Sequence, residues 1–171
     1  PGSGGTVTRN KYTYATNVST ACGVGSACVK NRNGSAAGNS TRGIFALGTI
    51  NCSPTLRRNK YTYATCTSTA CGVAGASANS TNNSAVGNST RGIFHLGLAP
   101  CSPSAVNNKY TYACCTSTTS GVASLSAASY CGSAAGNSTR GIFHLGFAPC
   151  RSVIRNKYTY ASCTNTASGV G

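Results

Sequence analysis

Hydrophobic and polar positions alternate with a period of two in short segments that recur along the chain. In one copy, residues 60–65 read Lys-Tyr-Thr-Tyr-Ala-Thr, which places Tyr61 and Tyr63 on one face and polar side chains on the other. This alternation, with aromatic and Thr residues, predicts a half-buried β-strand. Residues 91–97, bracketed by glycines, predict a second strand in which Phe94 and Leu96 share a face.

The segments between these strands have weaker patterns. The stretch around residues 72–74 (Gly-Val-Ala) predicts one or two further short strands, and residues 98–104, with two prolines, predict a turn-rich connector. No segment has a convincing apolar stripe with a period of 3.6 residues, although the Ala/Ser stretches have the composition for a short helix. The expected fold class is therefore all-β.

Both strand motifs repeat at a nearly fixed interval. Asn-Lys-Tyr-Thr-Tyr-Ala begins at Asn10, Asn59, Asn108 and Asn156, and Gly-Asn-Ser-Thr-Arg-Gly-Ile-Phe begins at Gly38, Gly87 and Gly136. A fixed period of this length indicates that each repeat is one supersecondary unit that buries its apolar face against its neighbours. Residues 1–171 are therefore one array, with repeats at about 10–58, 59–107 and 108–155 and a half repeat at 156–171.

Three or four short strands in about 49 residues match the size of a propeller blade. The alternative is a β-solenoid, in which each repeat forms one coil stacked on the last. The proline-bearing connectors and the length of the repeat favour blades.

The order of the motifs also resembles a known family. Lys-Tyr-Thr-Tyr-Ala, then Gly-Val-Ala, then Ala-Ala-Gly-Asn-Ser-Thr-Arg-Gly-Ile-Phe-x-Leu-Gly is similar to the kelch-like repeat proteins of bacteria and viruses. The resemblance covers almost the whole chain and implies a β-propeller, rarely with catalytic activity. The chain departs from that pattern by having Asn instead of Asp before Lys-Tyr, and it lacks the Gly-Gly doublet and paired aromatics of the better-known kelch motif.

The charge composition changes how the basic residues are interpreted. The chain has a formal charge of +14 and no Asp or Glu, whereas a chain of this length ordinarily has on the order of 20 acidic residues. Because Asn and Asp have nearly the same shape, we expect many of the 16 Asn to stand for Asp, which peptide mass spectrometry would test. Most Lys and Arg recur once per repeat, and only Arg57-Arg58-Asn59-Lys60 and Lys30-Asn31-Arg32 form local clusters. We therefore do not expect nucleic acid as a partner, despite the formal charge.

Eleven Cys are present, and many follow the repeat. The candidate disulfides pair residues 13 or 14 positions apart, namely Cys52 with Cys66, Cys101 with Cys115 and Cys150 with Cys163. Such bonds would indicate an oxidising compartment. Buried free thiols are the open alternative.

Asn39, Asn88 and Asn137 each begin an Asn-x-Thr triplet and are candidate glycosylation sites in a secreted or surface protein. Their recurrence in Gly-Asn-Ser-Thr equally predicts a turn before a strand, and this interpretation is favoured.

Catalytic chemistry has little support. His95 and His144 occupy equivalent positions, Ala46 replaces them in another repeat, and no carboxylate exists to orient either ring. General acid–base catalysis needs two groups with tuned pKa values. The chain also lacks a Gly-x-Ser-x-Gly elbow and a phosphate-binding loop. We therefore expect no enzyme and no cofactor.

The phase of the repeats predicts open β edges at the ends. The half repeat at 156–171 lacks the Arg-Gly-Ile-Phe strand, and completing it needs about 24 more residues. An unpaired edge recruits another strand. We expect copies of the chain, or further residues of the same chain, to pair with it, as a filament in preference to a ring.

The expected function is that of a non-enzymatic extracellular or surface repeat protein with a structural role. The alternative is a lectin-like propeller in which residues such as Tyr61, Tyr63 and Arg91 hold glycans. No run approaches the roughly 18 apolar residues that a membrane span needs.

Overall fold

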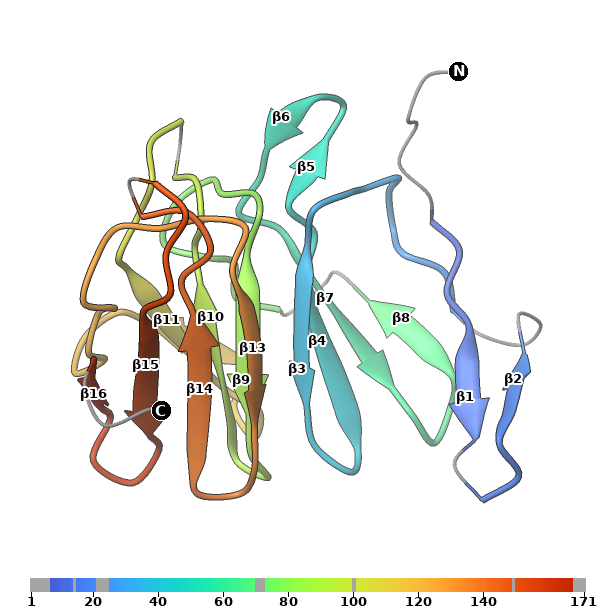
Figure 1. The fold of residues 1–171 in the computed structure, drawn as a ribbon. Helices are drawn as coiled ribbons and strands as arrows, with labels where there is room; N and C mark the ends of the chain where they lie inside the picture. Colours follow the sequence, from blue (N-terminus) through green and yellow to red (C-terminus); the bar gives the residue numbers. More distant parts are fainter. Residues whose placement is uncertain are drawn as a thin grey trace.

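Three antiparallel four-stranded sheets and two shorter strand pairs are formed along the described chain (Figure 1). This computed structural model describes residues 7–13, 15–20, 25–69, 73–99, 101–148 and 150–167. Every regular element within these ranges is a strand, which confirms the all-β class.

Each sheet takes its strands from two successive repeats. The N-terminal pair is β1 (Lys11–Thr13) and β2 (Val18–Thr20). The first sheet is β3 (Ser35–Gly38), β4 (Arg42–Ala46), β7 (Arg58–Thr62) and β8 (Thr67–Thr69). The middle sheet is β9 (Ser84–Gly87), β10 (Arg91–His95), β11 (Asn107–Thr111) and β12 (Thr116–Thr118). The last sheet is β13 (Ser133–Gly136), β14 (Arg140–His144), β15 (Arg155–Thr159) and β16 (Thr164–Thr166).

The strands of each sheet form a meander with one conserved register. Arg42 pairs with Thr62 in the first sheet, and Ile44 pairs with Lys60. The corresponding pairs recur in the middle and last sheets, so sequence repetition is reproduced as a repetition of register. The strand β9 contacts both β3 and β13. The first strand of each four-stranded sheet therefore lies beside the first strand of the next sheet.

Both faces of the middle sheet are buried. Ile93 and Phe94 are neighbours on β10 and point to opposite faces, yet they are 0% and 1% exposed. The second strand expected at residues 91–97 is present as β10, and both of its faces are covered. The reason is that a sheet packed between two others has no face left for water.

The weaker strands lie elsewhere than expected. Val73 and Ala74 are not in a strand, and Gly72 lies outside the described residues. The additional strands are β8 and β9, at the two ends of the segment. The proline-bearing connector is confirmed, because residues 98, 99 and 101–104 form only isolated bridges, one of them between Leu98 and Pro103.

The connector between β4 and β7 contains one small hairpin, formed by β5 (Thr49–Ile50) and β6 (Ser53–Pro54). This hairpin projects beyond the sheets in Figure 1. A buried hydrogen bond of 2.7 Å between the hydroxyls of Thr49 and Thr81 joins it to the next repeat.

Candidate assembly faces at the ends of the array

Arg58 at the start of β7 reaches from the first sheet to the middle one. Its Nη1 donates to Ser117 Oγ at 2.6 Å, and its Nη2 donates to Asn108 Oδ1 at 3.3 Å. The guanidinium carbon also lies 4.6 Å from the centre of the Phe94 ring. Only 2% of Arg58 is exposed, and this burial lowers its pKa to about 10, because water no longer stabilises the charged form.

A buried Asn receives this arginine contact. Asn59, Asn108 and Asn156 are each 0% exposed. Asn108 Oδ1 also accepts the backbone N–H of Ser77 at 2.9 Å, and its Nδ2 donates to Ser77 Oγ at 2.9 Å. One repeat earlier, Arg9 Nη2 donates to Asn59 Oδ1 at 3.4 Å. An Arg–Asn contact therefore links successive sheets twice.

The third link differs, because Asn107 stands where the other repeats have Arg. Asn107 Nδ2 donates to the Ala123 carbonyl at 2.8 Å and makes no contact with Asn156 like that of Arg58. Asn156 Oδ1 instead accepts from Asn165 Nδ2 at 2.7 Å. The same buried position thus exists with and without a neighbouring guanidinium.

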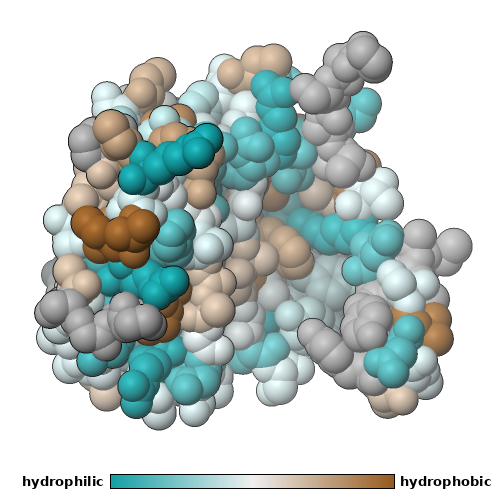
Figure 2. Space-filling view, viewed as in Figure 1, coloured by the Kyte–Doolittle hydropathy of each residue, from teal (hydrophilic) through white to brown (hydrophobic). Residues whose placement is uncertain are grey.

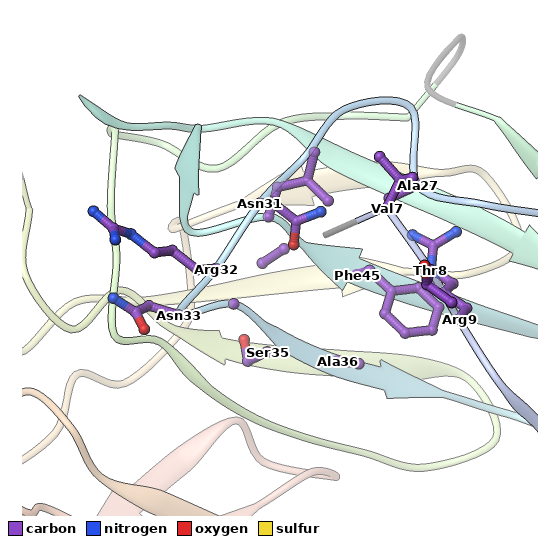
Figure 3. A pocket seen from close by; sticks show the side chains of 13 residues that line it. Val7, Thr8, Arg9, Ala27, Asn31, Arg32, Asn33, Ser35, Ala36 and Phe45 are labelled. Atoms are coloured by element: carbon purple, nitrogen blue, oxygen red, sulfur yellow. The ribbon is translucent and has the colours of Figure 1, made fainter. Parts of the chain in front are cut away.

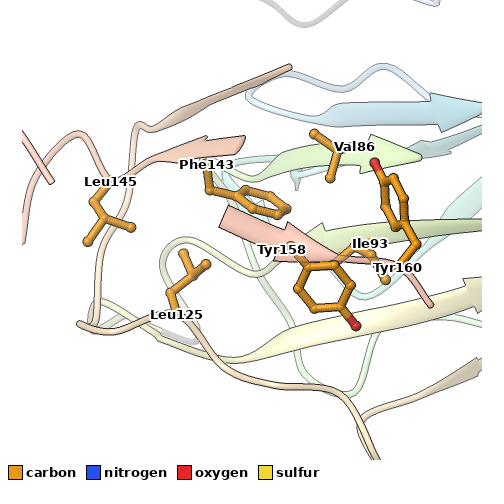
Figure 4. Close-up of a cluster of buried hydrophobic side chains, with 7 residues drawn as sticks. All are labelled: Val86, Ile93, Leu125, Phe143, Leu145, Tyr158 and Tyr160. Carbon is orange, nitrogen blue, oxygen red and sulfur yellow. The ribbon is translucent and has the colours of Figure 1, made fainter. Parts of the chain in front are cut away.

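Apolar side chains fill the remainder of each contact between sheets. Ile44 and Ala46 of β4 pack with Phe94, Tyr110 and Tyr112 of the middle sheet. The equivalent cluster between the middle and last sheets is shown in Figure 4. It consists of Val86, Ile93, Leu125, Phe143, Leu145, Tyr158 and Tyr160.

A second arginine binds the backbone of the following sheet. Arg42 Nη1 donates to the Tyr112 carbonyl at 2.9 Å, and Arg91 Nη1 donates to the Tyr160 carbonyl at 3.2 Å. Each of these arginines therefore connects the start of the second strand of one sheet to the residue that follows the third strand of the next sheet.

The Gly-Asn-Ser-Thr segments form turns, as the favoured interpretation expected. Asn39 Oδ1 accepts the backbone N–H groups two and three residues ahead. Its Nδ2 donates to the Ser89 carbonyl of the next turn at 2.8 Å, and Asn88 Nδ2 donates to Ser138 at 3.2 Å. Asn137 makes the same contacts within its turn and is exposed. Glycosylation at the three Asn stays a prediction.

The last sheet exposes the side chains that the other sheets bury in these contacts. Ile142 and His144 are partly exposed, whereas Ile93 is 0% and His95 1% exposed. Arg155 is exposed, whereas its equivalent Arg58 is 2% exposed. We call this surface the tail face, and it consists of Ala135, Arg140, Ile142, His144 and Arg155.

A cavity lies near the N-terminal side of the first sheet, between residues 7–9 and residues of β3 and β4. Phe45 of β4 is partly exposed, while its equivalents Phe94 and Phe143 are 1% and 0% exposed. Arg9 lies over the Phe45 ring at 4.3 Å (Figure 3). The cavity next to this pair has a volume of about 350 Å³. We call it the head cavity, and its lining includes Arg9, Ala27, Ala36, Phe45, Ala46 and Leu47.

The candidate disulfide residues are free thiols in the structure. This holds for Cys52, Cys66, Cys101, Cys115, Cys150 and Cys163. Cys52 precedes β7 and Cys66 follows it, so a strand that extends over about 16 Å separates them. A disulfide needs Cα atoms within about 7 Å, so the described geometry lends this pairing no support.

The residues proposed for glycan binding mostly have structural contacts. Tyr61 is 6% exposed, Tyr110 and Tyr158 are 0% exposed, and Tyr63 is 44% exposed. The shared face expected for Tyr61 and Tyr63 is present, with ring centres 5.8 Å apart. Arg91 binds the backbone of the next sheet, as described above, so these side chains offer little surface to a sugar.

His95 is buried, with its Nε2 3.0 Å from the Ser129 carbonyl, and burial lowers its pKa. Its contacts are those of a core side chain. His144 lies on the tail face, at the end of β14 in the last sheet, whereas His95 ends β10 in the middle sheet.

The buried Arg–Asn contacts were not anticipated. Arg57 and Arg58 read as one basic cluster in the sequence, but the structure exposes Arg57 and buries Arg58. The available signal was the recurrence of Arg before Asn-Lys-Tyr at positions 9, 58 and 155, which marks a fixed structural position and not a charged patch.

No family model matches the chain, and no curated protein matches it. In the described part of the chain, no helix is long and apolar enough to pass through a membrane.

Proposed function

We propose that this protein is a non-enzymatic structural protein of the extracellular space or cell surface, which assembles with copies of itself through the two ends of its array. The observation that carries this proposal is the exposure of Ile142, Arg140 and Arg155 on the tail face. The equivalents of these residues form the contacts between sheets inside the molecule. A surface that copies an internal interface is suited to the same kind of partner.

The tail face combines apolar and cationic groups in the arrangement found inside the molecule. Ile142 repeats the position of Ile44, which packs against a Phe of the following sheet. Arg155 repeats the position of Arg58, which packs over the same Phe. A second copy that presents its head end to this face supplies the partly exposed side chain of Phe45. The surface elsewhere carries only small apolar patches on the face shown in Figure 2.

We propose that the sheets are blades of a propeller-type arrangement, as the kelch-like resemblance implies. Each repeat period yields a separate four-stranded antiparallel meander, and the first strands of neighbouring sheets lie side by side. In a β-solenoid, each coil instead adds one strand to sheets that run through all the repeats. The meanders therefore support blades over coils.

A contact between a tail face and a head end is heterologous, since it joins two different surfaces. Such contacts continue into a filament unless the rotation between copies closes a ring. We favour the filament, with this chain as its subunit.

The test is the dependence of assembly on the tail face. Light scattering after size-exclusion chromatography, with negative-stain electron microscopy, should show oligomers that grow with protein concentration. Ile142→Arg should leave the fold intact by circular dichroism but yield monomers, because a charged side chain then occupies the apolar centre of the contact. Ser120→Arg is the matched control, since it adds the same charge at an exposed turn of the middle sheet. Monomers of the unmodified chain at all accessible concentrations would refute the proposal.

A further inference from the structure

We infer that Cys115 and Cys163 are oxidation sites, at which a hydroperoxide converts each thiol to a sulfenic acid whose oxygen is held by an arginine of the preceding sheet and by a buried tyrosine. This inference concerns contacts inside the chain and is independent of the proposed assembly.

Both sulfurs lie at a contact between two sheets. Cys115 and Cys163 occupy equivalent turn positions after the third strand of their sheets, with φ of 55° each, and both are partly exposed. Arg91 Nη1 of the middle sheet donates to Cys163 Sγ at 3.5 Å. Arg42 Nη1 of the first sheet donates to Cys115 Sγ at 3.9 Å. Partly exposed cysteines in electropositive surroundings are the kind that peroxides oxidise in redox-sensing proteins.

A buried hydroxyl beside each sulfur lacks a hydrogen-bond partner. Tyr110 and Tyr158 are 0% exposed, and neither Oη atom has a partner in the described part of the chain. Cys115 packs against the apolar cluster that contains Tyr110, and Cys163 packs against the one that contains Tyr158. Each hydroxyl is close enough to the cysteine five residues ahead for an electrostatic interaction, although the geometry gives no hydrogen bond. An oxygen bonded to the sulfur would supply the acceptor that each hydroxyl lacks.

The surroundings keep these hydroxyls as hydrogen-bond donors. Burial raises the pKa of Tyr110 and of Tyr158, because a buried phenolate would lose its hydration, and the neighbouring cysteine adds to the increase. The arginine side chain has only donors. An oxygen on the sulfur would therefore accept one hydrogen bond from a neutral group and one charge-assisted hydrogen bond, the stronger kind.

Each thiol consumes one molecule of hydroperoxide, ROOH. The sulfur attacks the terminal peroxide oxygen, so that an S–O bond forms and the O–O bond breaks. The sulfur loses two electrons, the peroxide is reduced to ROH, and the thiol proton goes to the leaving oxygen. The product is a sulfenic acid, which thiols reduce again.

The chain contains an internal comparison. Cys66 has the equivalent turn position, with φ of 54°, and is also partly exposed. The Oη of Tyr61, which interacts with Cys66, is buried and has no hydrogen-bond partner in the described ranges. Cys66 Sγ donates to the Tyr63 carbonyl, and no arginine donor to this sulfur is found among the described residues. Cys163 should therefore react faster than Cys66, because the guanidinium distinguishes the two sites.

The experiment treats the intact, reduced chain with hydrogen peroxide, stops the reaction with catalase and unfolds the protein in excess dimedone, which labels sulfenic acids. Peptide mass spectrometry then gives the rate of oxidation at each cysteine. Cys115 and Cys163 should react at least about tenfold faster than Cys66, the factor that one charge-assisted hydrogen bond supplies in the transition state. They should also react faster than the exposed cysteines, such as Cys52 and Cys150, which access to solvent alone would favour.

Two variants separate the roles of the donors. Arg91→Ala should slow the oxidation of Cys163 to the rate of Cys66 and leave Cys115 unchanged, because Arg42 contacts Cys115. Tyr158→Phe removes only a hydroxyl without a partner, so circular dichroism should show an intact fold. In this variant the sulfenic acid at Cys163 should convert to sulfinic acid at least about threefold faster, as expected for the loss of one neutral hydrogen bond.

The comparison of Cys163 with Cys66 needs no variant, so it decides the matter even if Arg91→Ala fails to fold. Equal rates at these two cysteines, or faster oxidation of the exposed cysteines, would overturn the inference. An effect of Arg91→Ala on Cys115, or a sulfenic acid lifetime that Tyr158→Phe leaves unchanged, would do the same. A disulfide between Cys150 and Cys163 as the main product would also overturn it, since the oxygen would then not be retained.

Discussion

The guanidinium of Arg58 meets a neutral amide, Asn108 Oδ1, at 3.3 Å, in a position where 2% of the arginine and none of the asparagine is exposed. A buried cation is ordinarily compensated by a carboxylate, because the loss of hydration is costly. The chain contains no Asp or Glu, so here the compensation consists of hydroxyl, amide and carbonyl oxygens and an aromatic ring.

A carboxylate at this position should stabilise the fold. Asn108→Asp keeps the shape of the side chain and adds a counter-ion for Arg58, so the free energy of unfolding should rise by about 1 kcal/mol or more. Urea denaturation at pH 7 measures this change. Asn156→Asp is the matched control, since Asn107 replaces the arginine there, and it should lose about 1–3 kcal/mol. Equal effects at the two positions would contradict the prediction and the idea that Asp belongs at position 108.

Removal of the buried arginine should be far more costly than removal of its exposed equivalent. Arg58→Ala removes the arginine's hydrogen bonds to Ser117 and Asn108 and opens a void beside Phe94, so we expect a loss of about 2–4 kcal/mol. Arg155→Ala should change the free energy of unfolding by less than about 0.5 kcal/mol, since it removes an exposed side chain. Thermal and urea unfolding of both variants provide the comparison.

The pH dependence of stability should have one main origin. Burial lowers the pKa of His95 in the folded state, so between that pKa and the ordinary value near 6.5 the unfolded chain binds more protons. Stability should therefore be full above about pH 6.5 and fall on acidification, by at most about 1.4 kcal/mol per pH unit. Without Asp or Glu, few other side chains titrate there. His95→Ala, which copies Ala46, should flatten the profile measured by urea denaturation from pH 7 to pH 5; an unchanged slope would refute this origin.

Glycosylation, if the chain is expressed through a eukaryotic secretory pathway, should favour Asn137. The Nδ2 groups of Asn39 and Asn88 donate to the next turn, whereas Asn137 is exposed and has no following turn among the described residues. Peptide mass spectrometry after enzymatic release of glycans should show the highest occupancy at Asn137. Higher occupancy at Asn88 than at Asn137 would show that the contact between turns does not restrict the site.

The period-two pattern predicted the central strands because alternation is a local property of the chain. The predicted strand at residues 60–65 became β7, although β7 begins two residues before this segment and ends before Tyr63. The sequence did not reveal that both faces of a sheet are covered. This depends on the packing of neighbouring repeats, which no local window contains.

The candidate site was predictable only in outline. Repetition predicted that the sheets pack against one another in one recurring way, but it did not show which side chains form the contact between sheets. Arg58 reads as a surface charge in isolation, and its burial follows from the position of Phe94 and Asn108 one repeat later. The cysteine spacing has the same limit, since the separation of Cys52 and Cys66 along the chain contains an extended strand, and the disulfide pairing stays a prediction.

The replacement of Arg by Asn at position 107 has a consequence for how the molecule avoids misfolding. Chains with nearly identical units are prone to exchange one unit for another while they fold. Ala37 and Val86 differ at one equivalent place in the contacts, and Arg58 and Asn107 differ at another. Each contact between neighbouring sheets therefore has its own set of side chains. A sheet that docks one unit out of order would meet side chains that do not match, which costs stability. A variant in which all three units are identical should still form sheets, but it should lose the preference for packing them in the correct order.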